Sequence, residues 1–183
     1  MLTLILGGAR SGKSRLAQRL AATAGRVTYV ATALAGQDPE MAARIARHRA
    51  DRPVSWQTIE EPLALARAVE RGANEADAVL VDCLTVWLSN LFWEHREGAP
   101  GQVEDAARAE LQRIAAAARH RHIILVSNEL GCGTVPEPAV TRAFRDAQGL
   151  LNQCAAEAAD EVILTVAGLP LYLKTSVRRK DAQ

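Results

Sequence analysis

Several features are missing from this chain of 183 residues, and each absence excludes a class of protein. The formal net charge at pH 7 is only +1, which argues against a general nucleic-acid-binding or membrane-binding surface. No apolar run reaches about 18 residues, so no transmembrane helix is expected. The chain begins with an apolar strand pattern, whereas a secretory signal begins with a charged segment and an apolar core. We therefore expect no nucleic-acid partner and no membrane span.

Cysteine is scarce, and the spacing of the cysteines is typical neither of a disulfide-linked protein nor of a zinc site. The three cysteines lie far apart and form no Cys-x-x-Cys pair: Cys83, Cys132 and Cys154. Their odd number argues against a set of disulfides or a zinc site, and a reducing cytoplasm is the expected location. We expect all three to be small, partly buried side chains.

Repeats, low-complexity tracts and long linkers are absent as well. The length suits one domain, and 49% hydrophobic residues are enough for a sizeable core. Glycine and proline gather within residues 94–102, which has the composition of an exposed loop and demands no domain boundary. We expect residues 1–183 to form a single domain.

What the chain does contain is an alternation of short apolar runs with longer helical patterns. The expected strands are residues 2–6, 27–31, 78–81, 123–127 and 161–166, with a last short strand at 171–173. The expected helices include residues 14–24, 39–49, 63–71 (ending at Gly72) and 103–121. Asp38 is the expected cap of the second of these helices. The alternation predicts an α/β fold with a mostly parallel sheet, helices on both faces, and ligands beyond the carboxyl ends of the strands.

The most informative feature present matches the phosphate-binding pattern G-x-x-x-x-G-K-[ST] without a mismatch: Gly7, Gly8, Ala9, Arg10, Ser11, Gly12, Lys13 and Ser14. An expected strand leads into this run and an expected helix leaves it, which is the setting that a phosphate loop (P-loop) requires. Its backbone N–H groups and the helix N-terminus favour an anion. Lys13 can reach the β- and γ-phosphates, and the Ser14 hydroxyl can ligate Mg²⁺. The alternative, a chance glycine-rich turn, is disfavoured by this context. We therefore expect the single domain over residues 1–183 to be a P-loop nucleotide-binding catalytic domain.

Two further patterns are weaker. Asp82 ends an apolar strand pattern, and in P-loop proteins such an acid often orients Mg²⁺; the alternative is a cap for the next helix. His48 lies among four arginines and one aspartate near a helix C-terminus. The arginines can bind phosphates and an imidazole can attack phosphorus, yet from composition alone a surface histidine among solvated arginines is the better interpretation.

Residues 128–137 follow the expected strand at 123–127 and contain polar side chains and two glycines, which suits a substrate loop or an ordinary turn equally well. The remaining histidines, His95, His120 and His122, have no spacing typical of a metal site, and we expect them at the surface.

Six segments occur in one order over nearly the whole chain: GGARSGKS (7–14), YVAT (29–32), EMAARIARHRADRPVSWQTIE (40–60), VDCLTVWLSNL (81–91), SNELGCGTVPE (127–137) and FRDAQGLLNQCAAEAADEV (144–162). Together they resemble the bifunctional adenosylcobinamide kinase / adenosylcobinamide-phosphate guanylyltransferase family of cobalamin biosynthesis. The segment ending in RPVSWQTIE is much more specific than the phosphate loop, and it reverses the interpretation of His48.

The resemblance implies two reactions: phosphorylation of the adenosylcobinamide hydroxyl by ATP or GTP, then transfer of GMP from GTP to that phosphate with release of pyrophosphate. It implies that His48 carries the guanylyl group and that Mg²⁺ accompanies the nucleotide. It also implies a homotrimer with sites near subunit boundaries. Asp82 stands where some relatives have Glu. Besides the phosphate loop, the nucleotide contacts that the resemblance implies are Ala31, Thr32, Ala33, Arg49, Ala50, Asp51, Arg52, Glu60 and Asp82.

Two other functions are open at this point. One is a P-loop kinase of another small metabolite without nucleotidyl transfer. Covalent labelling of His48 by GTP distinguishes such a kinase from the bifunctional enzyme. The other is a nucleotide-binding switch with little chemistry, which turnover of adenosylcobinamide excludes.

Overall fold

The computed structural model describes residues 1–33, 39–50, 52–96, 98–99 and 101–175. Its strands are β1 (Leu2–Gly7), β2 (Val27–Ala31), β3 (Gln57–Glu60), β4 (Ala78–Asp82), β5 (His122–Asn128), β6 (Glu161–Val166) and β7 (Leu169–Lys174). Its helices are α1 (Lys13–Ala21), α2 (Pro39–Ala50), α3 (Leu65–Glu75), α4 (Leu84–Glu94), α5 (Gln102–Ala117) and α6 (Ala139–Ala158). Within these ranges no helix is long and apolar enough to span a bilayer.

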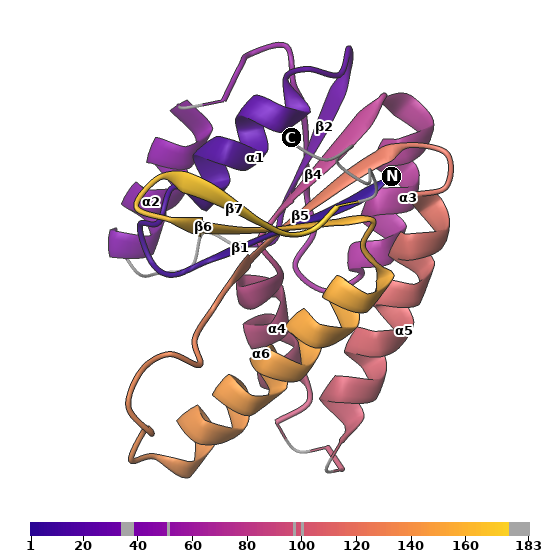
Figure 1. Cartoon of the computed structure of the whole chain (residues 1–183). Helices are drawn as coiled ribbons and strands as arrows, with labels where there is room; N and C mark the ends of the chain where they lie inside the picture. The colour runs from indigo at the N-terminus through magenta and orange to yellow at the C-terminus, as the bar shows by residue number, and fades with distance from the viewer. Residues whose placement is uncertain (34–38, 51, 97, 100, 176–183) are drawn as a thin grey trace, which may run out of the picture.

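All seven strands form one sheet in the order β3-β2-β4-β5-β1-β6-β7 (Figure 1). Strands β1 to β6 pair in parallel, and β7 pairs antiparallel with β6. The first strand therefore lies well inside the sheet, between β5 and β6. This placement buries β1 completely and supports the segment that follows it.

Side-chain alternation divides the core into two layers. On one face, Leu4, Leu125 and Val81 pack in the cluster formed with α3, α4, α5 and α6. On the other face, Ile5 and Ile124 pack with residues of α1, and Figure 1 shows α2 on this same side. The expected mostly parallel sheet with helices on both faces is confirmed.

The six expected strands are all present, but the apolar pattern of the sequence did not predict β3. This strand has four residues, lies at the edge of the sheet, and keeps only Ile59 partly packed against the core. An edge strand with so little apolar alternation gives no period-2 signal. The helices α4 and α6, which the sequence marked only as helical in character, also received no bounds. The expected cap at Asp38 lies outside the described residues.

The expected end of the third helix at Gly72 is wrong, because α3 continues through it to Glu75. A Cβ atom on Gly72 would lie 2.9 Å from Cγ2 of Thr28 in β2. The glycine thus allows α3 to approach the sheet closely. Local sequence does not distinguish a glycine needed for such packing from a glycine that ends a helix.

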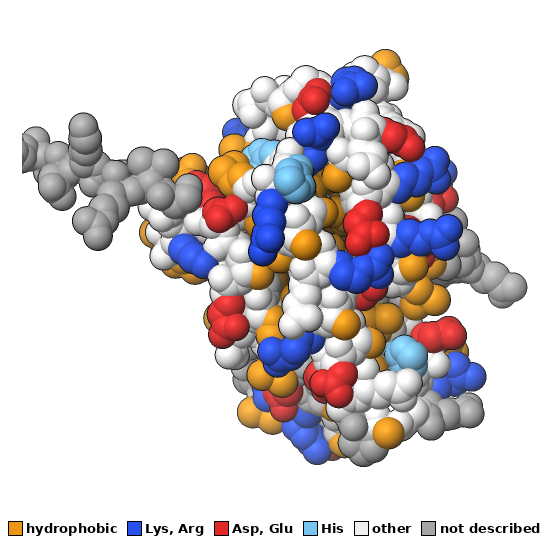
Figure 2. Space-filling view, turned by 90° about the vertical axis from the view of Figure 1, so that its right-hand side faces the viewer, with side chains coloured by type: hydrophobic (Ala, Val, Ile, Leu, Met, Phe, Trp, Pro, Cys, Tyr) orange, Lys and Arg blue, Asp and Glu red, His pale blue; other side chains and the backbone are white. Residues whose placement is uncertain are grey.

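The surface over α3 and α5 mixes charges of both signs. Figure 2, which faces this side, shows basic and acidic side chains interspersed with apolar ones. Arg113 of α5 joins the two helices through a bidentate contact with Glu70 of α3, at 3.0 Å from Nε and 2.7 Å from Nη2.

Candidate functional site

The candidate residues gather at the carboxyl edge of the sheet. Glu60, Ala31 and Asp82 are register partners at the ends of β3, β2 and β4. Gly7 ends β1 beside the end of β5. The strand residues one position before Glu60 and Asp82 pack toward the α3–α6 face, so both carboxylates belong to the opposite face, which carries α1 and α2.

The segment between β1 and α1 has the form of a phosphate loop. Arg10 and Gly12 have positive φ angles, 56° and 95°, which curl the backbone between strand and helix. The N–H of Ser11 donates to the carbonyl of Gly8 at 3.3 Å, and the Lys13 ammonium donates to the same carbonyl at 3.0 Å. The expected loop and its lysine therefore lie together at the N-terminus of α1, where anions are favoured.

The turn between β6 and β7 contacts the phosphate loop and hydrogen-bonds to it. The N–H of Gly168 donates to the carbonyl of Ser11 at 2.8 Å. A Cβ on Gly12 would lie 3.1 Å from the Gly168 Cα, and one on Gly7 would lie 2.7 Å from the Thr165 carbonyl oxygen. Both glycines are thus required by close backbone approach. Sequence reasoning missed Gly168, because a two-residue hairpin turn with both φ angles positive usually carries Asn-Gly or Asp-Gly and here carries Ala167-Gly168.

Asp82 is held by an aromatic side chain that the sequence analysis left without a role. The Tyr29 hydroxyl donates to Asp82 Oδ2 at 3.0 Å, and the Arg52 guanidinium stacks over the Tyr29 ring at 3.5 Å from its centroid. Burial and the Asp82 charge raise the pKa of Tyr29 far above its usual value. Tyr29 therefore remains a hydrogen-bond donor at any physiological pH. It connects two candidate nucleotide contacts that are far apart in sequence.

Arg49 and Glu60 form an ion pair between the end of α2 and the end of β3. Together with Tyr29, Arg52 and Asp82 they line a cavity of about 80 Å³. Arg49, Arg52 and Glu60 also line an adjoining, more open hollow of about 300 Å³. The structure thus brings the candidate arginines and carboxylates of two chain segments into one place.

Thr32 and Ala33 differ from each other in exposure. Thr32 is fully buried, and its hydroxyl donates to the Cys83 carbonyl at 2.8 Å and accepts from the Cys83 N–H at 3.0 Å. Burial raises the pKa of the Cys83 thiol to about 11, so it stays neutral. Ala33 is half-buried and lines the small cavity. Thr32 therefore links β2 to β4, and Ala33 is the member of this segment that faces the cavity.

His48 lies in α2, in the last turn before the helix ends at Ala50. One turn earlier Ile45 lines the small cavity, and the next residue, Arg49, carries the ion pair to Glu60. The structure thus brings the helix segment that contains His48 to the site, while the His48 side chain and all of Asp51 lie outside what it describes.

One histidine differs from its expected place. His122 was expected at the surface, but it is half-buried at the start of β5, with Nε2 at 3.0 Å from the Thr3 hydroxyl. Burial and the nearby N-terminal charge lower its pKa. The cysteines are free: Cys83 is buried, Cys154 is half-buried, and Cys132 is exposed instead of partly buried.

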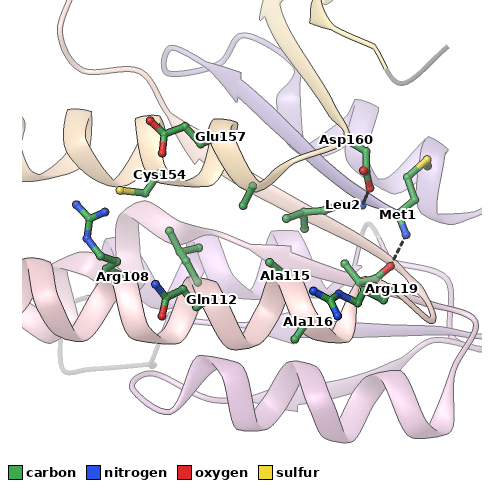
Figure 3. Close-up of a pocket in the computed structure, with 13 residues that line it drawn as sticks. Met1, Leu2, Arg108, Gln112, Ala115, Ala116, Arg119, Cys154, Glu157 and Asp160 are labelled. Atoms are coloured by element: carbon green, nitrogen blue, oxygen red, sulfur yellow. Dashed lines mark hydrogen bonds between the residues drawn. The ribbon is translucent and has the colours of Figure 1, made fainter.

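A larger hollow of about 800 Å³ lies at the opposite, amino edge of the sheet. Figure 3 shows its walls: α5 contributes Arg108, Gln112 and several alanines, and α6 contributes Cys154 and Glu157. The N–H of Leu2 donates to Asp160 Oδ2 at 2.7 Å beside it. Its position beside the first residues of β1 separates it from the phosphate loop, which follows the last residue of β1.

The fold and the loop at its carboxyl edge define a P-loop α/β protein. A solved ATPase from the type III secretion system of pathogenic bacteria has a similar fold, with a TM-score of 0.57 and 13% identity, covering 93% of this chain and 56% of that chain. The sequence is more specific than the fold: the family described as cobinamide kinase / cobinamide phosphate guanyltransferase matches residues 3–173. The chain belongs to this family.

Curated relatives agree with this assignment. The chain is 50% identical over 175 residues to the bifunctional adenosylcobalamin biosynthesis protein CobP of Pseudomonas aeruginosa, covering 95% of this chain and 98% of that protein. It is 40% identical to CobU of Escherichia coli and 41% identical to CobU of Salmonella typhimurium, each over 182 residues, covering 95% of this chain and all of the relative. These names describe bifunctional proteins, so a kinase of an unrelated metabolite is not favoured.

Proposed function

We propose that this protein phosphorylates adenosylcobinamide with ATP or GTP and then transfers GMP from GTP to the adenosylcobinamide phosphate, which gives adenosyl-GDP-cobinamide and pyrophosphate. Family membership supplies the substrate class. One observation carries the proposal to this chain: a complete phosphate loop and the helix that contains His48 meet the same face of one sheet edge. A nucleotide-binding switch without turnover has no such support.

In the first reaction the substrate hydroxyl oxygen attacks the γ-phosphorus, and the bond from that phosphorus to the β,γ-bridging oxygen breaks. The hydroxyl proton leaves to solvent, and the nucleoside diphosphate departs. The loop N–H groups and Lys13 stabilise the charge on the transferring group and on the diphosphate. The chain from Gly7 to Ser14 supplies this cradle mainly from its backbone, which the Gly168 contact holds in shape.

In the second reaction the neutral imidazole of His48 attacks the α-phosphorus of GTP, and pyrophosphate leaves with its electron pair. The substrate phosphate then attacks the same phosphorus, the phosphorus–nitrogen bond breaks, and the free imidazole returns. Two displacements replace one difficult step. We propose that Arg49 and Arg52, at the end of the same helix and just beyond it, bind phosphate oxygens.

We propose that a magnesium ion accompanies the nucleotide, where it would supply a positive charge to the transferring phosphates. Mg²⁺ binds proteins through few oxygen ligands and keeps waters and substrate phosphates around it. Ser14 offers a hydroxyl in the first turn of α1, and Asp82 offers a carboxylate on the same face of the sheet. We propose Ser14 as a direct ligand and Asp82 as a ligand directly or through water. The remaining nucleotide contacts that the resemblance implies are kept as part of this proposal.

A homotrimer and a cytoplasmic location complete the proposal. Support for an assembly comes from β7, an edge strand whose six residues are all exposed. Its apolar side chains Leu169, Leu171, Tyr172 and Leu173 are between 44% and 71% exposed, and such surfaces usually mark a protein contact. The single domain over residues 1–183 also stays a prediction.

The test is a two-stage turnover assay. The protein is incubated with adenosylcobinamide, Mg²⁺ and either ATP alone or ATP followed by GTP, and the corrinoid products are separated. We expect adenosylcobinamide phosphate in the first case, and adenosyl-GDP-cobinamide with one pyrophosphate per product in the second. Formation of adenosylcobinamide phosphate without adenosyl-GDP-cobinamide would leave only the kinase activity. If no corrinoid product formed in either case, the proposed function would be wrong.

A further inference from the structure

Asn128, at the carboxyl end of β5, has both of its backbone polar groups hydrogen-bonded by side chains of two helices. Its N–H donates to the Thr85 hydroxyl of α4 at 2.9 Å, and its carbonyl accepts from Asn152 Nδ2 of α6 at 3.0 Å. The next N–H, of Glu129, donates to the carbonyl of Gly7 at 3.1 Å. Hydrogen bonds from two helices to Asn128, and one from the next residue to the end of β1, therefore hold this strand end beside the phosphate loop.

A buried polar cluster stands behind these contacts. The Ser127 hydroxyl donates to Asn152 Oδ1 at 2.7 Å, and Gln148 Nε2 lies 2.9 Å from that hydroxyl and 3.0 Å from the same Asn152 oxygen. All three side chains are buried. Burial of polar groups costs free energy, and here the hydrogen bonds that offset it also orient Asn152 toward the Asn128 carbonyl. The cluster therefore works as a support for the strand end.

The side chain of Asn128 lies on the face that carries α1. Ser127 points toward α6, so its neighbour along the strand points to the opposite face, as Val126 does in the cluster with α1. Gly7, the first residue of the phosphate loop, is its register partner on β1. Within the described residues no protein group hydrogen-bonds the Asn128 side-chain amide, although its backbone is fully engaged. A rigidly held amide without a protein partner beside a phosphate loop is suited to contact a ligand.

We infer that the Asn128 side chain donates a hydrogen bond from Nδ2 to the terminal phosphate of the nucleotide in the phosphate loop. Ser127, Gln148 and Asn152 act through Asn128, as positioning residues. The identity of the nucleotide rests on the proposed function, but the contact itself is tested without any corrinoid.

The experiment compares the binding of nucleotides with and without a third phosphate. Affinities for ADP against adenylyl imidodiphosphate, and for GDP against guanylyl imidodiphosphate, are measured with Mg²⁺ by calorimetry. All measurements use the His48→Asn background, because the guanylyl analogue keeps the α,β bond that His48 would attack. Asn128→Ala is expected to weaken triphosphate-analogue binding by about tenfold, since it removes a hydrogen bond to a charged group, and to leave diphosphate binding unchanged. Asn128→Asp is expected to weaken it further, because a carboxylate repels the phosphate.

Asn74→Ala, at an exposed position of α3, is the matched control and is expected to change neither affinity. Asn152→Ala is expected to reduce the preference for the triphosphate analogue by less than Asn128→Ala does. An equal loss for diphosphate and triphosphate, or no loss, overturns the inference, as does a wild-type protein that binds neither analogue. Failure to turn over adenosylcobinamide, with the selective loss intact, would instead remove the proposed substrate.

Discussion

The phosphate loop and the end of α2 approach the same sheet edge but are built in different ways. The loop is shaped by its backbone: two positive φ angles, a carbonyl held by Gly168, and glycines at positions where a Cβ does not fit. The end of α2 is joined to the sheet by side chains, through the exposed ion pair of Arg49 with Glu60 and the stacking of Arg52 on Tyr29.

Because of this difference, we expect substitutions in the two regions to affect activity in different ways. A site made of backbone groups depends on glycine and on local geometry, and it serves any phosphate that the loop receives. A site made of side chains depends on each residue and can be removed one function at a time. We therefore expect changes in the loop to affect both reactions, and changes near α2 to affect them unequally.

The largest effect is expected from Lys13→Ala. Lys13 is placed to neutralise charge on the β- and γ-phosphates, which develops in phosphoryl transfer and on a pyrophosphate leaving group. Each reaction should slow by more than about tenfold, equal to roughly 1.4 kcal/mol of barrier. Separate kinase and guanylyltransferase assays measure this, and wild-type rates in either would remove Lys13 from that reaction.

Gly12→Ala tests whether backbone shape governs the loop. A non-glycine residue at φ 95° is strained by about 1–2 kcal/mol, and the new Cβ would meet Gly168. Both activities should fall severalfold together. The matched control is Gly101→Ala, at φ 85° with open space around its Cβ position and at the N-terminus of α5. Equal losses of activity in the two variants would mean that general destabilisation, measured by thermal unfolding, is the cause.

Asp82→Asn separates the charge of this residue from its shape. Asn can still accept the hydrogen bond from Tyr29, but it lacks the negative charge that a metal ion favours. We expect a higher Mg²⁺ requirement and a severalfold loss of turnover with little change in thermal stability. Asp105→Asn, at an exposed position of α5, is the control. An unchanged Mg²⁺ dependence would limit Asp82 to a structural role through its hydrogen bond with Tyr29.

The smallest effect is expected from Tyr29→Phe. The ring and its stacking with Arg52 remain, while the hydrogen bond to Asp82 is lost. Loss of one such bond to a charged group corresponds to about 1.5–3 kcal/mol. Water restores part of this at the half-buried Asp82 carboxylate, so we expect a severalfold rise in KM for the nucleotide. Tyr172→Phe on exposed β7 is the control. A loss of stability without a change in KM would make Tyr29 a core residue only.

The phosphate loop was predictable from sequence because a local pattern determines a local backbone shape. The neighbourhood of α2 was not, because Arg49, Tyr29 and Glu60 meet only when β2 and β3 pair, and β3 has almost no apolar pattern. The resemblance to the family supplied the candidate contacts near α2 that the hydrophobic periodicity did not indicate. Membership of that family is confirmed. Gly72 shows the limit of local signals, since a glycine that permits packing was interpreted as a helix end.

The most direct test of the account is covalent labelling of His48 by GTP. The wild-type protein and His48→Asn are incubated with α-labelled or γ-labelled GTP and separated by denaturing electrophoresis. We predict that wild type retains label only from the α position, in an acid-labile and comparatively base-stable bond, while His48→Asn retains none and still phosphorylates adenosylcobinamide. If His48→Asn still became labelled from the α position and still made adenosyl-GDP-cobinamide, the assignment of His48 would be contradicted.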